Sequence, residues 1–147
     1  MKVEFDINQV YEEIEIVIKA PLMSEEVRDI AERINSGVNE VIGKEGGKVF
    51  IIKLSDVVRF YSEDQKVKFD TLDKSLEIKM KLYEIEETVI DTAFVRVSKF
   101  AIVNVKKIKS IEAKNGGLVI NLINEKTEPI SRRYVKKVKE FIGMGGR

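Results

Sequence analysis

Apolar and polar residues change their spacing along the chain, and each spacing predicts a different element. Residues 13–19 alternate between the two classes, which predicts a strand with one apolar face. Apolar residues then recur every three or four positions from 24 to 38, which predicts an amphipathic helix with Ser24 as its N-cap. The chain is therefore expected to begin with a strand and a helix. The apolar residues of the strand are Ile14, Ile16 and Ile18.

Three glycines within residues 43–48, "GKEGGK", interrupt this periodicity. Such a cluster predicts a linker or a tight turn. It lacks the Gly-Lys-Ser/Thr ending of a phosphate-binding loop, so a nucleotide site is not expected here. We place a domain boundary in this stretch, with an N-terminal segment over 1–45 and a second domain over 46–147.

Alternation returns after the boundary and predicts a series of short strands. Helical spacing over 82–89 predicts one short helix, and a second helix is expected to follow Ser131 near the end of the chain. Asn115 and Gly116 form a pair that is typical of a hairpin turn. The predicted fold class is mainly β with flanking helices (α+β), built from short antiparallel strands. The predicted strands cover residues 48–54, 57–62, 66–71, 75–80, 94–97, 101–105, 108–113 and 118–123.

The composition argues against most catalytic and metal-binding chemistry. The 147 residues include no histidine and no cysteine, which excludes histidine acid–base pairs, thiolate nucleophiles and the common zinc sites. Glu25 and Glu26 are adjacent, so their carboxylates do not converge on a substrate as an acid–base pair would. We therefore expect no enzyme activity, no cofactor, no metal and no small-molecule substrate.

Charge is distributed unevenly. Residues 1–45 hold 5 basic and 11 acidic residues, a net charge of −6, whereas residues 46–147 carry a net charge of +7. The stretch 96–147 alone holds 13 basic and 4 acidic residues. Such an asymmetry indicates a polyanionic partner, although an uneven solvated surface would give the same counts.

The sequence gives no sign of secretion or of membrane insertion. Its first residues show no uninterrupted apolar region of the signal-peptide type. Wholly apolar runs such as "VFII" at 49–52 reach 4 residues, whereas a membrane-spanning helix needs about 20. A soluble cytoplasmic protein is expected.

Four stretches follow one another in an order and at a spacing that match a known pattern. They are "IKLSDVVRFYSEDQKVKF", "LYEIEETV", "FVRVSKFAIVNVKKIKSI" and "ISRRYVKKVKEFI". Taken together, over roughly residues 48–142, they resemble the LytTR DNA-binding domain of bacterial transcription regulators. The resemblance implies a LytTR-like β-fold whose inter-strand loops enter successive major grooves of duplex DNA, reading base edges and DNA bending. It also implies paired DNA repeats and a homodimer.

The resemblance places DNA contacts in three regions. Lys99 leads the central loop and is expected to contact a phosphate or a guanine edge, and Arg133 is expected to use its planar fork on guanine or phosphate. Arg132 could instead brace the domain through an ion pair, and Phe100 could be a core residue. The full set comprises Gln65, Lys66 and Lys68 in the first hairpin, Ser98, Lys99 and Phe100 in the central loop, and Arg132, Arg133 and Lys136 in the last helix.

Other motif residues are expected to be structural. Asn104 should satisfy backbone groups at a turn, and Ser131 should cap the last helix. The lysines of "VKKIK" at 105–109 fall on both sides of a strand and are expected to form a solvated face rather than a DNA contact.

The chain also departs from the family pattern. Ser98 stands where a histidine is often found, and Phe100 stands where a serine is usual, so the hydrogen-bonding groups of that loop differ. Residues 1–45 are too short for a receiver domain, so control by phosphorylation of such a domain is not expected. We interpret this segment as a dimerisation element or as the docking site of a membrane-bound inhibitory partner. The alternative function is a protein-interaction module that has lost DNA binding, since an exposed Phe100 would suit a protein interface.

Overall fold

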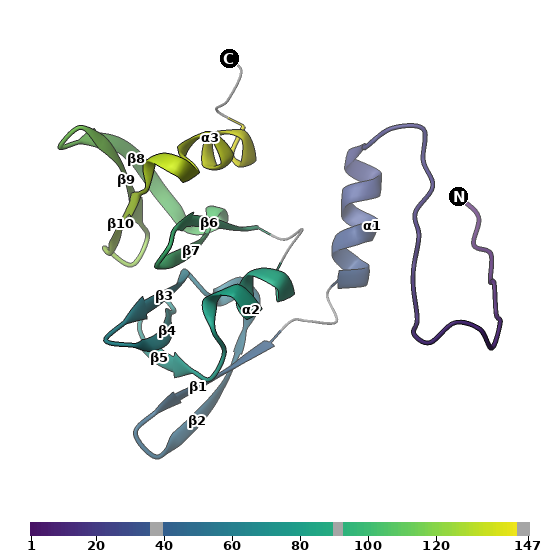
Figure 1. Ribbon diagram of the computed structural model, residues 1–147, viewed down its shortest axis with the longest axis horizontal. Helices are drawn as coiled ribbons and strands as arrows, with labels where there is room; N and C mark the ends of the chain where they lie inside the picture. The colour runs from purple at the N-terminus through teal and green to yellow at the C-terminus, as the bar shows by residue number, and fades with distance from the viewer. Residues whose placement is uncertain (36–39, 90–92, 144–147) are drawn as a thin grey trace. The chain divides into compact units, whose positions relative to one another are not determined.

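A computed structural model describes residues 1–35, 40–89 and 93–143 (Figure 1). The chain divides into two compact units, residues 1–35 and 36–147, and each is described here by itself. The predicted boundary after residue 45 falls within a hairpin turn of the second unit, so the division lies earlier in the chain. Within the described residues, no helix is both long and apolar enough to cross a membrane.

The first unit contains the predicted helix but not the predicted strand. Helix α1 (Glu25–Asn35) begins after Ser24, whose hydroxyl accepts a hydrogen bond from the Val27 backbone N–H at 3.3 Å, which confirms the N-cap. Residues 13–19 form no strand, and that prediction was wrong. A strand needs a neighbour to satisfy its backbone groups, and alternation alone does not supply one.

The second unit consists of two antiparallel sheets and two helices. A seven-stranded sheet has the order β2-β1-β5-β4-β3-β7-β6, and a three-stranded sheet has the order β10-β9-β8. The predicted strands and both predicted helices are present, whereas β1 and β10 were not predicted. The strands are β1 (Glu40–Glu45), β2 (Lys48–Lys53), β3 (Arg59–Glu63), β4 (Lys66–Asp70), β5 (Ser75–Ile78), β6 (Phe94–Ser98), β7 (Ala101–Asn104), β8 (Ile108–Lys114), β9 (Gly117–Leu122) and β10 (Thr127–Ile130), and the helices are α2 (Leu82–Thr88) and α3 (Arg132–Phe141).

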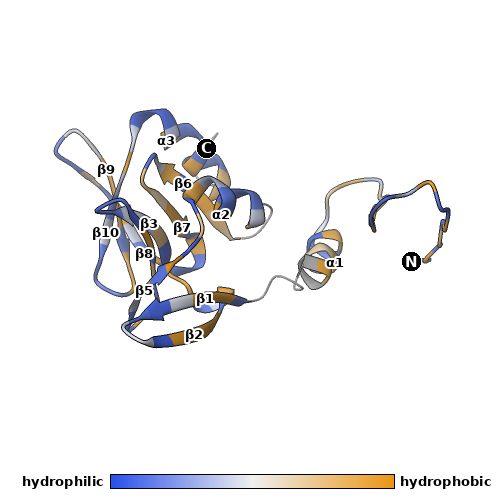
Figure 2. Ribbon diagram, turned by 60° about the horizontal axis from the view of Figure 1, so that its bottom comes forward, coloured by the Kyte–Doolittle hydropathy of each residue, from blue (hydrophilic) through white to orange (hydrophobic). Residues whose placement is uncertain are grey.

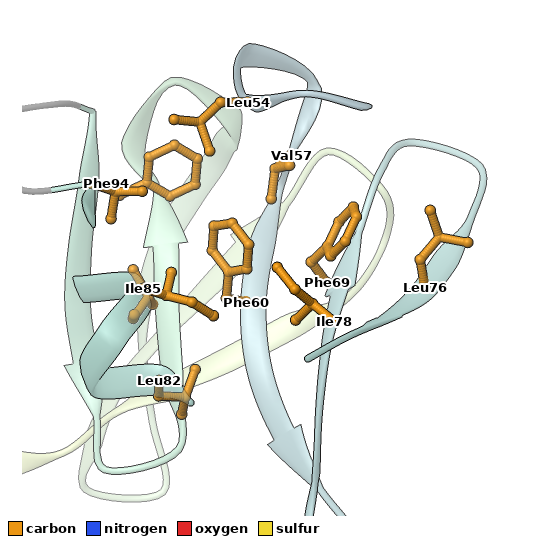
Figure 3. Packing of buried hydrophobic residues seen from close by; sticks show 11 residues of the cluster. Leu54, Val57, Phe60, Phe69, Leu76, Ile78, Leu82, Ile85 and Phe94 are labelled. Carbon is orange, nitrogen blue, oxygen red and sulfur yellow. The ribbon is translucent and has the colours of Figure 1, made fainter. Parts of the chain in front are cut away.

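Hydrophobic residues cover both faces of the central strands. On one face, α2 closes a cluster around Phe60, whose ring centroid lies 5.7 Å from that of Phe69 and 5.5 Å from that of Phe94 (Figure 3). The opposite face packs against the three-stranded sheet and α3 through a second cluster that includes Val97 and Val138. Strands β6 and β7 serve both clusters and are accordingly largely hydrophobic in Figure 2. Strands β3, β6 and β7 are therefore covered on both faces.

Gly43 belongs to the core rather than to a linker. It lies in β1, where an added Cβ would stand 2.7 Å from the Cβ of Leu76 and 2.7 Å from the ring of Phe69. Only the later glycines of "GKEGGK" form the turn, in which Gly46 has a φ of 60°. The stretch "GKEGGK" thus begins within strand β1 and ends in a tight turn.

Replacing Gly43 by alanine is expected to lower the free energy of unfolding by about 1–3 kcal/mol, because the added methyl group overpacks the cluster around Phe69 and Leu76. Urea unfolding followed by circular dichroism would measure the change. Gly47→Ala is the matched control, since an added Cβ at Gly47 meets nothing within 4 Å. Equal stability of the two variants would contradict the packing argument.

Candidate nucleic-acid interface

The turn between β3 and β4 is held in an unusual backbone conformation. Asp64 and Gln65 both have positive φ values, 52° and 65°, in a two-residue hairpin where Asn-Gly is the favoured pair. A left-handed conformation costs a residue other than glycine about 1 kcal/mol. Both side chains are exposed. The hairpin thus presents the Gln65 side chain to solvent at its tip.

The turn between β6 and β7 is built around hydrogen bonds of its own residues. Ser98 is 6% exposed, and its hydroxyl oxygen accepts a hydrogen bond from the Phe100 N–H at 3.0 Å. Lys99 is exposed, and Phe100 is 59% exposed, so Phe100 is not a core residue. The Ser98 side chain is used inside the turn, and we therefore leave it out of the contacts proposed below.

Two backbone hydrogen bonds bring the three predicted contact regions together. The Ser62 N–H donates to the carbonyl of Phe100 at 2.9 Å, so the β3–β4 hairpin runs beside the β6–β7 turn. The Ser131 N–H donates to the carbonyl of Val97 at 3.0 Å, which ties the start of α3 to the end of β6. Segments far apart in the sequence are thus neighbours in the fold. We call the β3–β4 turn, the β6–β7 turn and the first turn of α3 the reading surface.

The first turn of α3 is strongly electropositive. Arg132 and Arg133 are exposed, and this turn contains no acidic residue. Ser131 occupies the N-cap position, but its side chain makes no capping hydrogen bond, which corrects the expected cap. The first N–H groups of a helix and its dipole favour anions, so this end suits a phosphate or the acceptor atoms of a base.

The lysines and arginines predicted to contact DNA differ in whether a carboxylate lies near them. Lys66 lies 3.8 Å from Glu77, and Lys68 lies 3.5 Å from Glu63. Lys68 is also half-buried, which leaves it the least accessible of the set. Within the part of the chain that the structure describes, no carboxylate lies within ion-pair distance of the four remaining cations, so the expected bracing ion pair of Arg132 is not found there. These cations are Lys99, Arg132, Arg133 and Lys136.

Asn104 has the structural role that the sequence indicated. It is 2% exposed, its amide donates to the carbonyl of Val57 at 2.9 Å, and its side-chain oxygen accepts from the Lys106 N–H at 3.0 Å. Among the neighbouring lysines, Lys109 lies 3.4 Å from Glu125 at the surface. This basic stretch makes an ordinary solvated ion pair, and we place no DNA contact in it.

The sequence did not predict a site role for Arg96, yet its side chain binds three partners beside the β6–β7 turn. Its guanidinium donates to the carbonyls of Ser98 and Lys99, both at 2.7 Å, and it pairs with Glu86 of α2 at 3.3 Å. The signal in the sequence was an arginine between two valines on an otherwise apolar strand. A charged residue in such a place needs partners, but the sequence does not identify them.

A second buried charge cluster supports the start of α3. Arg59 donates to Asp70 at 2.7 Å and also binds Glu128 of β10, the strand that leads into α3. The guanidinium carbon of Arg59 stands 4.0 Å from the centre of the Tyr61 ring. Burial raises the pKa of Glu128, and the charge of Arg59 opposes that shift. The cluster joins β3 and β4 to β10 and so helps to fix the three-stranded sheet against the central one.

Comparison with known proteins identifies a matching family model and similar chains. A family model described as the LytTr DNA-binding domain matches residues 47–143. An uncharacterized HTH-type transcriptional regulator of Staphylococcus aureus strain MSSA476 is 31% identical over 98% of this chain and 99% of its own length, and one from strain MRSA252 is 30% identical over the same shares. The names of these relatives refer to a helix-turn-helix motif, which consists of two helices joined by a short turn. In the described part of this chain, no two consecutive helices are joined in that way.

A solved LytTr DNA-binding domain from Bacillus cereus has a similar fold. It superposes with a TM-score of 0.67 at 23% sequence identity and covers 71% of this chain and 97% of its own. At this level of identity, the likeness concerns the fold alone.

Proposed function

This chain belongs to the LytTR DNA-binding domain family, and we propose on that basis that it is a transcriptional regulator that binds specific sites in duplex DNA. The observation that carries the proposal is the reading surface. Two backbone hydrogen bonds, Ser62 to Phe100 and Ser131 to Val97, place two hairpin turns and a helix N-terminus side by side. Each of these elements presents an exposed polar or basic side chain, and the surface needs no cofactor to do so.

The side chains on the reading surface match the chemistry of the major groove. Arg133 can bind O6 and N7 of guanine with two parallel hydrogen bonds, and Gln65 can bind N6 and N7 of adenine in the same manner. Lys99 and Lys136 are suited to phosphates, which fix the position of a protein on the duplex without reading sequence. We propose base contacts for Arg133 and Gln65, and phosphate contacts for Lys99, Lys136 and Arg132. Lys66, and Phe100 through its exposed ring, would lie at the margin of the contact.

Selection from a random pool of short duplexes, repeated across a salt series, tests this function. We expect an enriched motif of two repeats and an affinity that falls steeply with salt, because bound phosphates release counterions. Weak binding of all duplexes without any enrichment would contradict the proposal. It would favour the alternative of a protein-interaction module centred on Phe100. We propose that the protein is cytoplasmic, because a transcriptional regulator must have access to DNA.

We further propose that the first unit makes the regulator a homodimer. Its residues before α1 expose large apolar side chains, including Val3, Phe5, Ile7 and Ile14, which are 72%, 84%, 87% and 94% exposed. Exposed apolar side chains in this number indicate an interaction site. A dimer would place two reading surfaces on two repeats, and the second binding event would gain from the high effective concentration.

Removing residues 1–35 is expected to convert a dimer into a monomer and to abolish the preference for paired over single repeats. The second unit keeps its own core and both hydrophobic clusters, so it should remain folded. Sedimentation equilibrium and binding to one-repeat and two-repeat duplexes would measure both effects. A dimer that persists without residues 1–35 would instead leave this segment for an inhibitory partner, such as the membrane-bound one implied by the family resemblance.

A further inference from the structure

The side chain of Arg96 is half-buried, and each of its three nitrogens has a hydrogen-bond partner. It lies in β6 between Val95 and Val97, which are 3% and 0% exposed, and its own side chain is 13% exposed. Its Nε donates to the carbonyl of Ser98 at 2.7 Å, one terminal nitrogen donates to the carbonyl of Lys99 at 2.7 Å, and the other pairs with Glu86 at 3.3 Å. All three nitrogens therefore have protein partners.

These contacts determine the course of the β6–β7 turn. The register between β6 and β7 shifts between Arg96 and Ser98, which marks a bulge where the strand changes direction. Beyond the bulge, the carbonyls of Ser98 and Lys99 are turned toward the guanidinium. The Lys99 side chain and the Phe100 ring remain exposed at the tip of the turn.

We propose that Arg96 is a positioning residue for DNA recognition, which rests on the function proposed above. It fixes the backbone of the β6–β7 turn before DNA arrives, so that Lys99 meets the duplex in one orientation, and it does not touch DNA itself. A loop already held in its bound conformation loses less entropy on binding, and that gain is realised in full only on a duplex whose sequence lets its phosphates take the shape that fits the loop. Arg96 thus contributes to sequence preference without reading a base.

The chemistry of the side chain explains why this position needs arginine. The planar guanidinium presents donors in a fixed fork and can hold two neighbouring carbonyls at once, whereas a lysine ammonium is a point charge on a flexible stem. The pair with Glu86 adds an anchor in α2, and Glu86 itself is 40% exposed. The two hydrogen bonds to the carbonyls of Ser98 and Lys99 hold the turn. The ion pair with Glu86 orients the guanidinium that donates them.

The test compares full-length wild type with Arg96→Lys, Arg96→Met and Glu86→Gln on the selected duplex and on a scrambled duplex of the same composition, across a salt series. We expect both Arg96 variants to lose about tenfold in affinity for the selected duplex, which corresponds to one hydrogen bond to a charged group. Binding to the scrambled duplex should stay within about threefold, and the salt dependence should keep its slope, because no phosphate contact is removed. Glu86→Gln should have a smaller effect, since the carbonyl bonds remain.

NMR of the free protein tests the positioning role of Arg96 separately from the proposed DNA-binding function. In NMR spectra of the free protein, the amide resonances of residues 98–100 should move in both Arg96 variants, while those of the core strand β4 should not. Equal losses on both duplexes would overturn the inference, and so would a salt slope lower by about 1, which would make Arg96 a phosphate contact. If wild type selects no duplex, the regulator function itself fails. Unmoved turn resonances would reject the positioning role by itself.

Discussion

Replacing Arg133 by alanine is expected to lower the affinity for the selected duplex by about 1–3 kcal/mol, and to lower the affinity for a scrambled duplex far less. The reason is geometric. Arg133 lies in the first turn of α3, it is exposed, and in the described part of the chain no carboxylate competes for its fork. If the fork reads a guanine, its loss removes discrimination at that base pair but leaves the phosphate contacts in place. Fluorescence anisotropy on both duplexes measures the difference.

Two further variants make the Arg133 result interpretable. Lys139→Ala removes one positive charge from the last turn of the same helix, so it measures the effect of net charge alone. Arg133→Lys keeps the charge but loses the fork, and should recover phosphate attraction without base discrimination. Equal losses for Arg133→Ala on the selected and scrambled duplexes would mean that Arg133 binds phosphate only.

The Arg133→Ala variant should fold as stably as wild type. A cation near the N-terminus of a helix interacts unfavourably with the helix dipole, so removing Arg133 is expected to leave the free energy of unfolding unchanged or to raise it by up to about 1 kcal/mol. Weaker binding together with equal or higher stability would show that the residue is kept for recognition. Two further features of the reading surface do not favour stability. Ser131 makes no capping hydrogen bond to α3, and the backbone of Gln65 is in the left-handed region.

The hydrophobic pattern predicted most of the strands because each of these has a face that packs on one of the two hydrophobic clusters. It failed where a proline or a glycine interrupts the pattern, and where an alternating stretch has no partner strand. Strand β10 contains Pro129, which argues against a central strand, but β10 is the edge of the three-stranded sheet, where a missing N–H is tolerated. Strand β1 contains Gly43, and a glycine in a glycine-rich stretch indicates a turn unless the neighbouring Leu76 and Phe69 are known. Residues 13–19 alternate, yet have no partner strand.

The candidate site was predictable only in part, and for a related reason. Residue type and family spacing predicted contacts for Lys99, Arg132 and Arg133, and the structure shows that these side chains are exposed. They could not show that Ser98 faces inward, because that depends on its bond to the Phe100 N–H. Nor could they show the role of Arg96, since its partners are backbone carbonyls, and every residue type presents the same carbonyl. Sequence identifies chemical groups, whereas the turn conformation decides which of them are accessible.

Replacing Arg59 by methionine is expected to destabilise the protein by about 3–5 kcal/mol, because it leaves two carboxylates without their buried partner. The side chains of Arg59, Asp70 and Glu128 are 12%, 2% and 11% exposed. The surface pair of Lys66 and Glu77 supplies the control, since Lys66→Met removes an exposed partner and should cost less than about 1 kcal/mol. Urea unfolding of both variants measures the contrast, and similar small losses would mean that the Arg59 cluster is well solvated.

The pH dependence of the Arg59→Met variant distinguishes a buried charge from lost packing. Burial already raises the pKa of Glu128, and Arg59 is the group that opposes this shift, so its removal should raise that pKa further. A carboxyl group with a raised pKa in the folded state is most favourable below its unfolded pKa, and its contribution is lost as pH rises through the folded value. The deficit of the variant relative to wild type should therefore be largest near neutral pH and shrink as pH falls toward the unfolded pKa of Glu128. A deficit that stays constant with pH would indicate that the methionine merely packs poorly, because packing does not depend on protons.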